Sequence, residues 1–318
     1  MLGNEAIARG AWEAGVKLSS AYPGTPSTEI SEYLAKYEEV YTEWAPNEKV
    51  AAEVAIGASI SGVRSLACMK HVGLNVASDP LYTFAYTGVG GGSVFVVADD
   101  PGLASSQNEQ DTRMIARAAH VPVLEPSDSS EAKEFLKYAY KLSEKYDTPV
   151  ILRMCTRIAH SRSIVETTGR EEVALKDYVK EPAKYIMMPG NAIKRHPVVE
   201  ARTEALRALA ENCKFNTVEY NSDEIGIITS GSSYLYVKEV LGDSASVMKI
   251  GMPNPLPVES IKDFASKVKK LYVIEELDGI IESHVRSLGI EVVGKELFSP
   301  LGEFSQATVA SAFGKAIP

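Results

Sequence analysis

The chain has 318 residues, of which 45% are hydrophobic and 24% are charged, and its formal net charge at pH 7 is −9. This length suffices for two domains with separate cores. The acidic balance argues against a nucleic-acid partner, because it leaves no excess of basic side chains to neutralise phosphates.

The sequence also gives no sign of export, a membrane span or a metal cluster. The first residues do not form a signal peptide, and no apolar run approaches the length of a membrane span. The three cysteines, Cys68, Cys155 and Cys213, lack the spacing of a disulfide framework, a zinc site or an iron–sulfur cluster. A cytoplasmic location is therefore expected.

The chain begins with a helix, a strand and a turn. Residues 3–16 have apolar positions at helical spacing, and a short strand is expected at 18–22. The turn 23–26, Pro-Gly-Thr-Pro, is rigid and leads into a helix that Ser27 could cap. Open α/β sheets bind ligands at turns of this kind, between the carboxyl end of a strand and a helix, although Pro-Gly turns are also common in ordinary loops.

Residues 46–62 predict a helix made mostly of small side chains. Asn47 is placed to cap this helix, because its side chain can accept a hydrogen bond from a free backbone N–H group. Gly57 lowers helix stability unless another backbone or a flat ligand approaches closely. Glu48, at the start of the helix, is either a charge that complements the helix dipole or the acid of a buried site. These residues alone leave both interpretations open.

Alternating strands and helices then continue to about residue 160. Strands are expected at 64–71, 93–98 and 149–154, with helices between them. His71 falls where a strand ends, although a lone histidine is more often structural. The glycine cluster 88–92 does not fit a dinucleotide-binding loop, because it precedes a strand instead of following one. The position of these glycines disfavours a dehydrogenase. The alternation of strands and helices predicts one doubly wound α/β domain over residues 1–160.

The second half predicts a connector and another α/β domain. Residues 161–220 contain charge clusters and prolines, and they predict a connector with one helix at about 198–211. Residues 221–318 alternate again, with strands expected at 247–250 and 271–274 and an edge strand at 290–293.

Several motifs in both halves share one resemblance. They are Tyr-Pro-Gly-Thr-Pro-Ser-Thr-Glu-Ile from residue 22, Asn-Glu-Lys-Val-Ala-Ala-Glu from 47, Met-Lys-His-Val-Gly-Leu-Asn-Val from 69, the polar run from Asp99 to Arg113, Gly-Met-Pro-Asn-Pro-Leu-Pro over 251–257 and Val-Ile-Glu-Glu-Leu over 273–277. Together they resemble the alpha subunit of the indolepyruvate:ferredoxin oxidoreductases, which are thiamine-diphosphate-dependent 2-oxoacid:ferredoxin oxidoreductases. The resemblance covers essentially the whole chain. It implies a pyrimidine-binding domain followed by a transketolase-C-terminal-like domain.

The resemblance also implies roles for particular residues. Glu48 would be catalytic, hydrogen-bonding N1′ of the cofactor's aminopyrimidine so that this ring can remove the C2 proton of the thiazolium. Thr25 would lie near both cofactor and substrate. His71, Arg113 and Arg117 are further candidates for the 2-oxoacid carboxylate, which a guanidinium can bind in bidentate fashion. The cofactor-binding residues implied are Tyr22, Pro23, Gly24, Thr25, Pro26 and Glu48.

One large part of the family pattern is missing. The family's alpha subunit continues into a third domain, where Gly-Asp-Gly and a downstream Asn hold magnesium and diphosphate, and then into a ferredoxin-like tail. Here Gly242-Asp243-Ser244 is followed by Asn254 only ten residues later. The chain is thus expected to bind only the pyrimidine half of thiamine diphosphate, with Mg²⁺ and iron–sulfur clusters on missing domains or partner chains.

The expected function follows from this partial resemblance. The chain would be a subunit or fragment that converts an aryl 2-oxoacid and coenzyme A to acyl-CoA, carbon dioxide and reduced ferredoxin. It would be inactive without a diphosphate-binding domain, and it would work in a dimer or hetero-oligomer with a partner subunit. The alternative is a non-catalytic module that binds or assembles with partners on a thiamine-enzyme-like scaffold.

Overall fold

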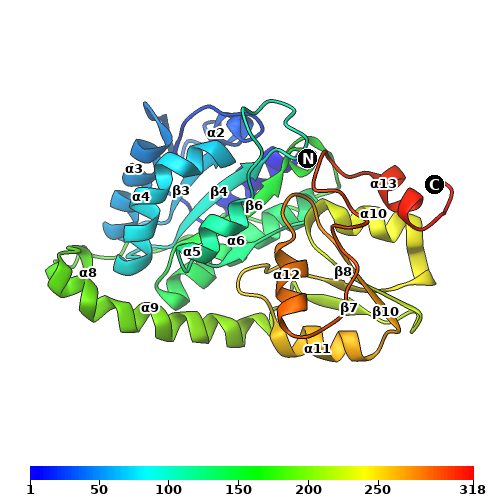
Figure 1. Ribbon diagram of the computed structural model, residues 1–318. Helices are drawn as coiled ribbons and strands as arrows, with labels where there is room; N and C mark the ends of the chain where they lie inside the picture. Colours follow the sequence, from blue (N-terminus) through cyan, green and yellow to red (C-terminus); the bar gives the residue numbers. More distant parts are fainter.

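Two sheets, each covered by helices on both faces, organise the computed structural model, which describes residues 1–318 (Figure 1). The first sheet is parallel throughout and has the strand order β2-β1-β3-β4-β6-β5. Its strands are β1 (Leu18–Ala21), β2 (Tyr41–Trp44), β3 (Ser65–Lys70), β4 (Ser93–Asp99), β5 (Val123–Leu124) and β6 (Val150–Cys155). The strand order reverses between β1 and β3, and such a reversal opens a crevice at the carboxyl ends of parallel strands.

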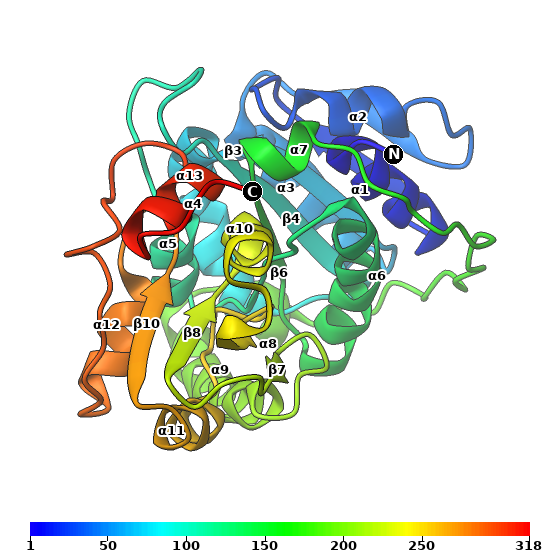
Figure 2. The ribbon, with the colours of Figure 1, turned by 90° about the vertical axis from the view of Figure 1, so that its right-hand side faces the viewer.

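Helices cover both faces of the first sheet (Figure 2). One face carries α1 (Gly3–Glu13), α2 (Thr28–Leu34) and α6 (Ser129–Tyr146). The other carries α3 (Glu48–Ile60), α4 (His71–Thr87) and α5 (Thr112–Ala118). Two separate apolar cores result, because each helix buries one stripe against the sheet. The short helix α7 (Thr156–His160) follows β6.

The second sheet is smaller and mixed, with the strand order β10-β8-β9-β7. Three of its strands are parallel, namely β8 (Ile225–Thr229), β9 (Ser246–Lys249) and β10 (Lys270–Ile274), whereas β7 (Thr217–Glu219) runs antiparallel to β9. One face packs against α10 (Gly231–Leu241) and α13 (Gln306–Ala312), and the other against α11 (Val258–Ser266) and α12 (Ile280–Ser287). A single 3-10 turn, η1 (Gly242–Ser244), follows α10.

The predicted fold of two α/β domains is confirmed, with differences in detail. The edge strand expected at 290–293 is reduced to one parallel bridge between Val293 and Tyr272. The connector is more structured than expected, since it contains α8 (Pro182–Tyr185) and the long α9 (Pro189–Ala210). Its last residues form β7, so the second sheet begins before residue 221. No helix in either domain has the length and apolar character needed to cross a membrane.

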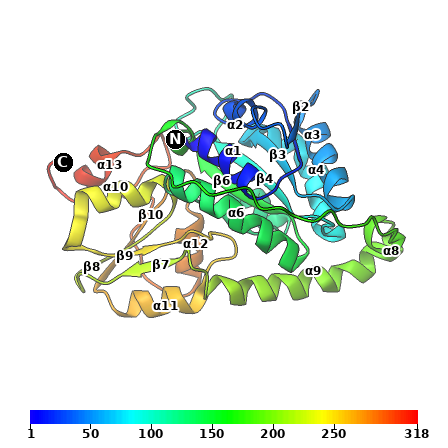
Figure 3. The same ribbon diagram turned by 180° about the vertical axis from the view of Figure 1, so that it is seen from behind.

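The extended part of the connector lies across the back of the first domain (Figure 3). Glu13, at the end of α1, anchors it there. The Glu13 side chain is 0% exposed and accepts hydrogen bonds from Lys137 Nζ at 2.8 Å and from the Thr168 hydroxyl at 2.6 Å. Burial alone would raise the pKa of Glu13, but hydrogen bonds from Lys137, Thr168 and Arg9 outweigh burial and lower this pKa to about 2.

Because of this anchor, we expect the free energy of unfolding to fall as the solution is acidified from about pH 4.5 to about pH 2. A carboxyl group with a depressed pKa in the folded state stabilises the fold above its unfolded pKa, and the stabilisation is lost as pH falls through the folded pKa. At about 1.4 kcal/mol per pKa unit, the loss is at most about 3 kcal/mol. Urea unfolding of the wild type and Glu13→Gln across this range measures it. A stability difference between them that stays constant with pH would contradict the prediction.

Candidate functional site

Three predicted site segments meet at the carboxyl edge of the first sheet. The turn 22–26 leaves β1, Glu48 begins α3 soon after β2, and His71 begins α4 directly after β3. β1 pairs with both β2 and β3, and its last residue, Ala21, lies opposite Trp44 and Cys68. The three segments therefore emerge side by side at the crevice where the strand order reverses.

The turn 22–26 is held by hydrogen bonds from both sides. Asn4 of α1 donates its amide to the Pro26 carbonyl at 2.8 Å, and the Gly24 N–H donates to the Thr28 hydroxyl at 2.9 Å. Ser27 occupies the N-cap position of α2, as predicted, but its hydroxyl donates to the Gly24 carbonyl instead of capping the helix. These contacts fix the turn and leave the side chains of Tyr22 and Thr25 exposed.

Glu48 lies at the N-terminus of α3, and its carboxylate is partly buried. Asn47 caps this helix as predicted, because its side chain accepts a hydrogen bond from Val50 N at 3.0 Å. The Glu48 carboxylate packs against Gly73 in the first turn of α4, where an added Cβ would lie 2.5 Å from Oε1. Gly73 is thus needed for this close approach, and sequence reasoning missed it. The Glu48 carboxylate makes no hydrogen bond or ion pair within the chain, so both of its oxygens are available to a ligand.

The residues of α3 face two different surroundings. Ala51, Ala52 and Ala55 are fully buried against the sheet and α4. Glu53 and Gly57 face outward, and no atom of the chain lies within 4 Å of the place a Cβ on Gly57 would take. No other part of this chain therefore makes the close approach that Gly57 would permit.

His71 is buried, and only one of its ring nitrogens has a partner. Its Nε2 lies 3.0 Å from the backbone oxygen of Asn108. A carbonyl oxygen can only accept, so this contact requires the proton on Nε2 and leaves Nδ1 as an acceptor. Nδ1 is buried and unpartnered. A ligand that meets Nδ1 would therefore need a hydroxyl or N–H group, which the carboxylate predicted for His71 lacks.

The polar loop 100–111 folds over the same edge and connects the segments. Lys70 Nζ donates to the Ser105 carbonyl at 3.0 Å, and the Ser105 hydroxyl donates to the Thr25 carbonyl at 3.2 Å. Asp100 fixes the loop by accepting from Ser105 N at 2.8 Å and from the Ser106 hydroxyl at 2.6 Å. Burial would raise the pKa of Asp100, but these hydrogen bonds lower it. The polar composition of this run is thus explained by its contacts above β1 and β3.

Arg113 does not offer its guanidinium to a ligand at this edge. Its side chain is fully buried, with Nη2 2.6 Å from Asp111 Oδ2 and Nη1 2.7 Å from Glu275 Oε2 of the second domain. Burial lowers the pKa of Arg113, but the carboxylates of Asp111 and Glu275 raise it above its ordinary value. Nη2 also donates to the backbone oxygens of Glu276 and Asp278. The structure supports a role in joining the domains, and not the predicted contact with substrate.

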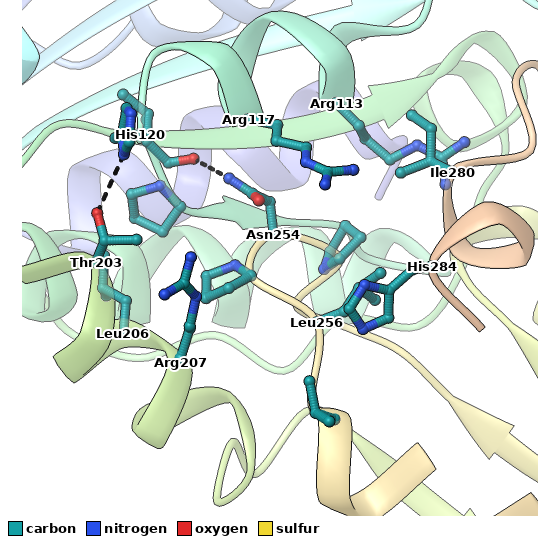
Figure 4. Close-up of a pocket in the computed structure, with 15 residues that line it drawn as sticks. Arg113, Arg117, His120, Thr203, Leu206, Arg207, Asn254, Leu256, Ile280 and His284 are labelled. Carbon is teal, nitrogen blue, oxygen red and sulfur yellow. Dashed lines mark hydrogen bonds between the residues drawn. The ribbon is translucent and has the colours of Figure 1, made fainter. Parts of the chain in front are cut away.

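Arg117 lies apart from the other predicted residues. It lines a cleft between the domains, and that lining includes none of residues 22–26, Glu48 or His71 (Figure 4). α5 starts beside the carboxyl end of β4 and returns the chain toward the start of β5, so its last turn lies toward the amino edge of the sheet. The predicted site residues are thus divided between two places.

The residues at the carboxyl edge fit the pyrimidine half of thiamine diphosphate. The free carboxylate of Glu48 and the unpartnered Nδ1 of His71 match the hydrogen-bonding atoms of an aminopyrimidine ring. The structure contains no group of three or more His, Cys, Asp or Glu side chains placed to hold a metal ion.

Comparison with known families decides the identification. Residues 9–221 match the family described as pyruvate flavodoxin/ferredoxin oxidoreductase, thiamine diphosphate-binding. The chain belongs to this family. The match to this oxidoreductase family covers Glu48, His71 and the turn 22–26, and it extends through the connector.

Curated relatives are similar over the whole chain. The chain is 42% identical to indolepyruvate oxidoreductase subunit IorA of Archaeoglobus fulgidus, covering 100% of this chain and 53% of the relative. It is also 42% identical to IorA of Thermococcus kodakarensis, covering 99% of this chain and 52% of the relative. The chain therefore spans about half the length of these relatives. The 2-oxoglutarate synthase subunit KorA of Archaeoglobus fulgidus is 24% identical, with 94% of both chains covered.

Solved structures share the fold. The chain matches the 2-oxoglutarate:ferredoxin oxidoreductase from Magnetococcus marinus with a TM-score of 0.78 and 20% identity, covering 99% of this chain and 64% of the other. A split-gene transketolase, described as an inactive β4 tetramer, matches with a TM-score of 0.63 and 17% identity, covering 100% of this chain and 98% of the other. These likenesses support the two-domain architecture predicted from the sequence.

Proposed function

We propose that the chain is part of an indolepyruvate-type 2-oxoacid:ferredoxin oxidoreductase. The complex would convert an aryl 2-oxoacid and coenzyme A to acyl-CoA, carbon dioxide and reduced ferredoxin. The observation that carries this proposal is the partly buried, unpartnered carboxylate of Glu48 at the carboxyl edge of a thiamine-diphosphate-binding family domain. The names of the relatives at 42% identity support an indolepyruvate-like substrate.

The residues of this chain would bind and orient the pyrimidine half of the cofactor. When bound, thiamine diphosphate supplies the carbon nucleophile that attacks the 2-oxoacid carbonyl. Glu48 would hold a proton at its carboxylate for a ring nitrogen, and the residues Tyr22–Pro26 would flank the ring. The Thr25 hydroxyl would lie near the substrate, and His71 would accept a hydrogen bond at Nδ1.

The remaining parts of the site would come from outside the described residues. Mg²⁺, the diphosphate ligands and the iron–sulfur clusters would belong to a partner subunit or to further domains, in a dimer or hetero-oligomer. Surface features support an association at this side of the domain, because Trp44 of β2 and Val76 of α4 are about half exposed and Gly57 has open space above it. The cytoplasm would be the location.

Reconstitution tests this function against the alternative of a non-catalytic assembly module. The chain should reduce ferredoxin with indolepyruvate and coenzyme A only when it is combined with a partner that carries the diphosphate-binding domain. Partner alone and chain alone are the controls. Activity of the partner alone, unchanged on adding the chain, would favour the non-catalytic module.

We also expect the purified chain to bind thiamine diphosphate weakly. The family's Gly-Asp-Gly and downstream Asn are not matched, because Gly242-Asp243-Ser244 is followed by Asn254 after only ten residues, so we expect the charged half of the cofactor to gain no metal-mediated contact. Isothermal calorimetry with thiamine diphosphate, with and without Mg²⁺, measures this. Stoichiometric, Mg²⁺-dependent binding with a micromolar dissociation constant would contradict it.

A further inference from the structure

A basic cleft of about 270 Å³ lies between the two domains, separate from the carboxyl edge of the first sheet (Figure 4). Its walls come from α5, from α9, from the segment 253–258 and from α12. Arg117 enters from α5, Arg207 from α9 and His284 from α12, and His120 lies at one end. No carboxylate side chain lines the cleft.

The basic groups differ in how far their charge is already balanced. Arg113, at the edge of the cleft, is paired with Asp111 and Glu275. Arg207 is paired with Glu204 on the surface of α9. Arg117, in contrast, is exposed and has no hydrogen bond or ion pair within the chain. The cleft therefore contains one guanidinium with no counter-charge and a second that is paired only at the surface.

His284 supplies an independent indication of a ligand. Its Nε2 atom is buried and has no hydrogen-bond partner. Such groups are uncommon in folded proteins, and either a water molecule or a ligand can supply the missing partner. Burial lowers the pKa of His284, and the nearby charge of Arg117 lowers it further. An anion bound in the cleft beside the two side chains would offset this repulsion.

We propose that this interdomain cleft binds a small phosphate-bearing ligand, with the phosphate group between Arg117 and His284. Donors converge on the cleft from three helices, a geometry that suits the several oxygens of a phosphate better than the two coplanar oxygens of a carboxylate. A volume of about 270 Å³ is at the small end of ligand pockets. The site does not depend on the proposed oxidoreductase function, because it contains none of the residues at the carboxyl edge.

Calorimetry on the full chain, in a buffer without phosphate, tests this proposal. Inorganic phosphate and adenosine monophosphate are the two probes. We expect binding that Arg117→Gln weakens at least tenfold. Arg157→Gln removes the same charge from an arginine that pairs with Glu303 outside the cleft, and it should leave the affinity unchanged.

The two probes distinguish the source of the phosphate. Tighter binding of inorganic phosphate identifies the free ion, whereas tighter binding of the nucleotide identifies a phosphate group on a larger molecule. Failure of both to bind the wild type at millimolar concentration would overturn the proposal. Equal weakening by Arg117→Gln and Arg157→Gln would also overturn it, because it would indicate a general effect of charge.

Nuclear magnetic resonance of the His284 ring provides a second measurement. Arg113, Arg117, Arg207 and His120 are the other titratable groups that line the cleft, and all of them are bases. Bound phosphate should therefore raise the pKa of His284, and Arg117→Gln should abolish this response to the ligand. If Arg117→Gln fails to fold, the wild-type titration decides alone. If calorimetry shows binding but the pKa of His284 does not change, the ligand binds elsewhere and the proposal is contradicted.

Discussion

Glu48→Gln should lower turnover of the reconstituted complex by about 10²–10⁴-fold, the usual contribution of a general acid–base group. Glutamine keeps the size of the side chain and its position above Gly73, but it cannot exchange a proton with a ring nitrogen. The fold should be unaffected, because the Glu48 carboxylate makes no hydrogen bond within the chain. Ferredoxin reduction measures turnover, and hydrogen exchange at C2 of the bound cofactor measures the step that Glu48 would assist.

Glu53→Gln is the matched control for this experiment. Glu53 lies on the same helix with its side chain facing outward, and the substitution removes the same charge. It should change the exchange rate far less than Glu48→Gln. If Glu48→Gln exchanges hydrogen at the wild-type rate, Glu48 is only a charge at the start of a helix.

Arg113→Gln should destabilise the chain by about 3–5 kcal/mol, which is typical when one partner of a buried ion pair is removed. Glutamine would leave Glu275 buried without its guanidinium partner. Asp111 would keep the backbone N–H of residue 113 as a donor, but its only ion-pair partner would be Arg153, whose Nε lies 3.9 Å away. Both domains would be affected, because the Arg113–Glu275 ion pair joins them. Urea unfolding followed by circular dichroism measures the loss.

The pH dependence of Arg113→Gln provides a check on this explanation. Burial already raises the pKa of Glu275, although Arg113 opposes that effect. Without Arg113 this pKa should rise further. A carboxyl whose pKa is higher in the folded state than in the unfolded state destabilises the fold progressively as the pH rises from its unfolded pKa to its folded pKa. The stability deficit of the variant should therefore shrink as the pH falls toward the ordinary pKa range of a glutamate.

Arg157→Gln serves as the control for an exposed pair. The Arg157–Glu303 ion pair also joins the two domains, but the arginine side chain is 51% exposed. Such pairs contribute about 1 kcal/mol or less. Equal losses of stability in Arg113→Gln and Arg157→Gln would show that burial does not set the strength of these contacts.

The fold could be predicted largely because its central strands are buried on both faces. Segments such as residues 94–98 are continuous apolar runs, the pattern of parallel strands between two layers of helices. β2 was missed because Tyr41–Trp44 forms an edge strand of polar and aromatic residues. The start of α9 was misplaced because Pro189 and Pro197 are usually helix breakers, although a proline is well tolerated in the first turn.

The candidate site was predictable only where local chemistry decides the geometry. Asn47 and Glu48 could be placed because a helix cap and the residue after it follow from neighbours in the sequence. Arg113 could not be placed, because its partner Glu275 lies 162 residues away. His71 could be located at the end of a strand, but the contact with Asn108 that sets its donor and acceptor nitrogens depends on how the loop 100–111 folds.

The connector is attached to the first domain along much of its length. Glu171 pairs with Arg64, Thr168 with Glu13 and Lys184 with Asp147, so the connector is fastened to the first domain at several points before α9 begins. These attachments remove the slack that a hinge between the domains would need. A ligand that approaches the edge therefore meets Tyr22 and Thr25 already exposed, without the domains having to swing apart.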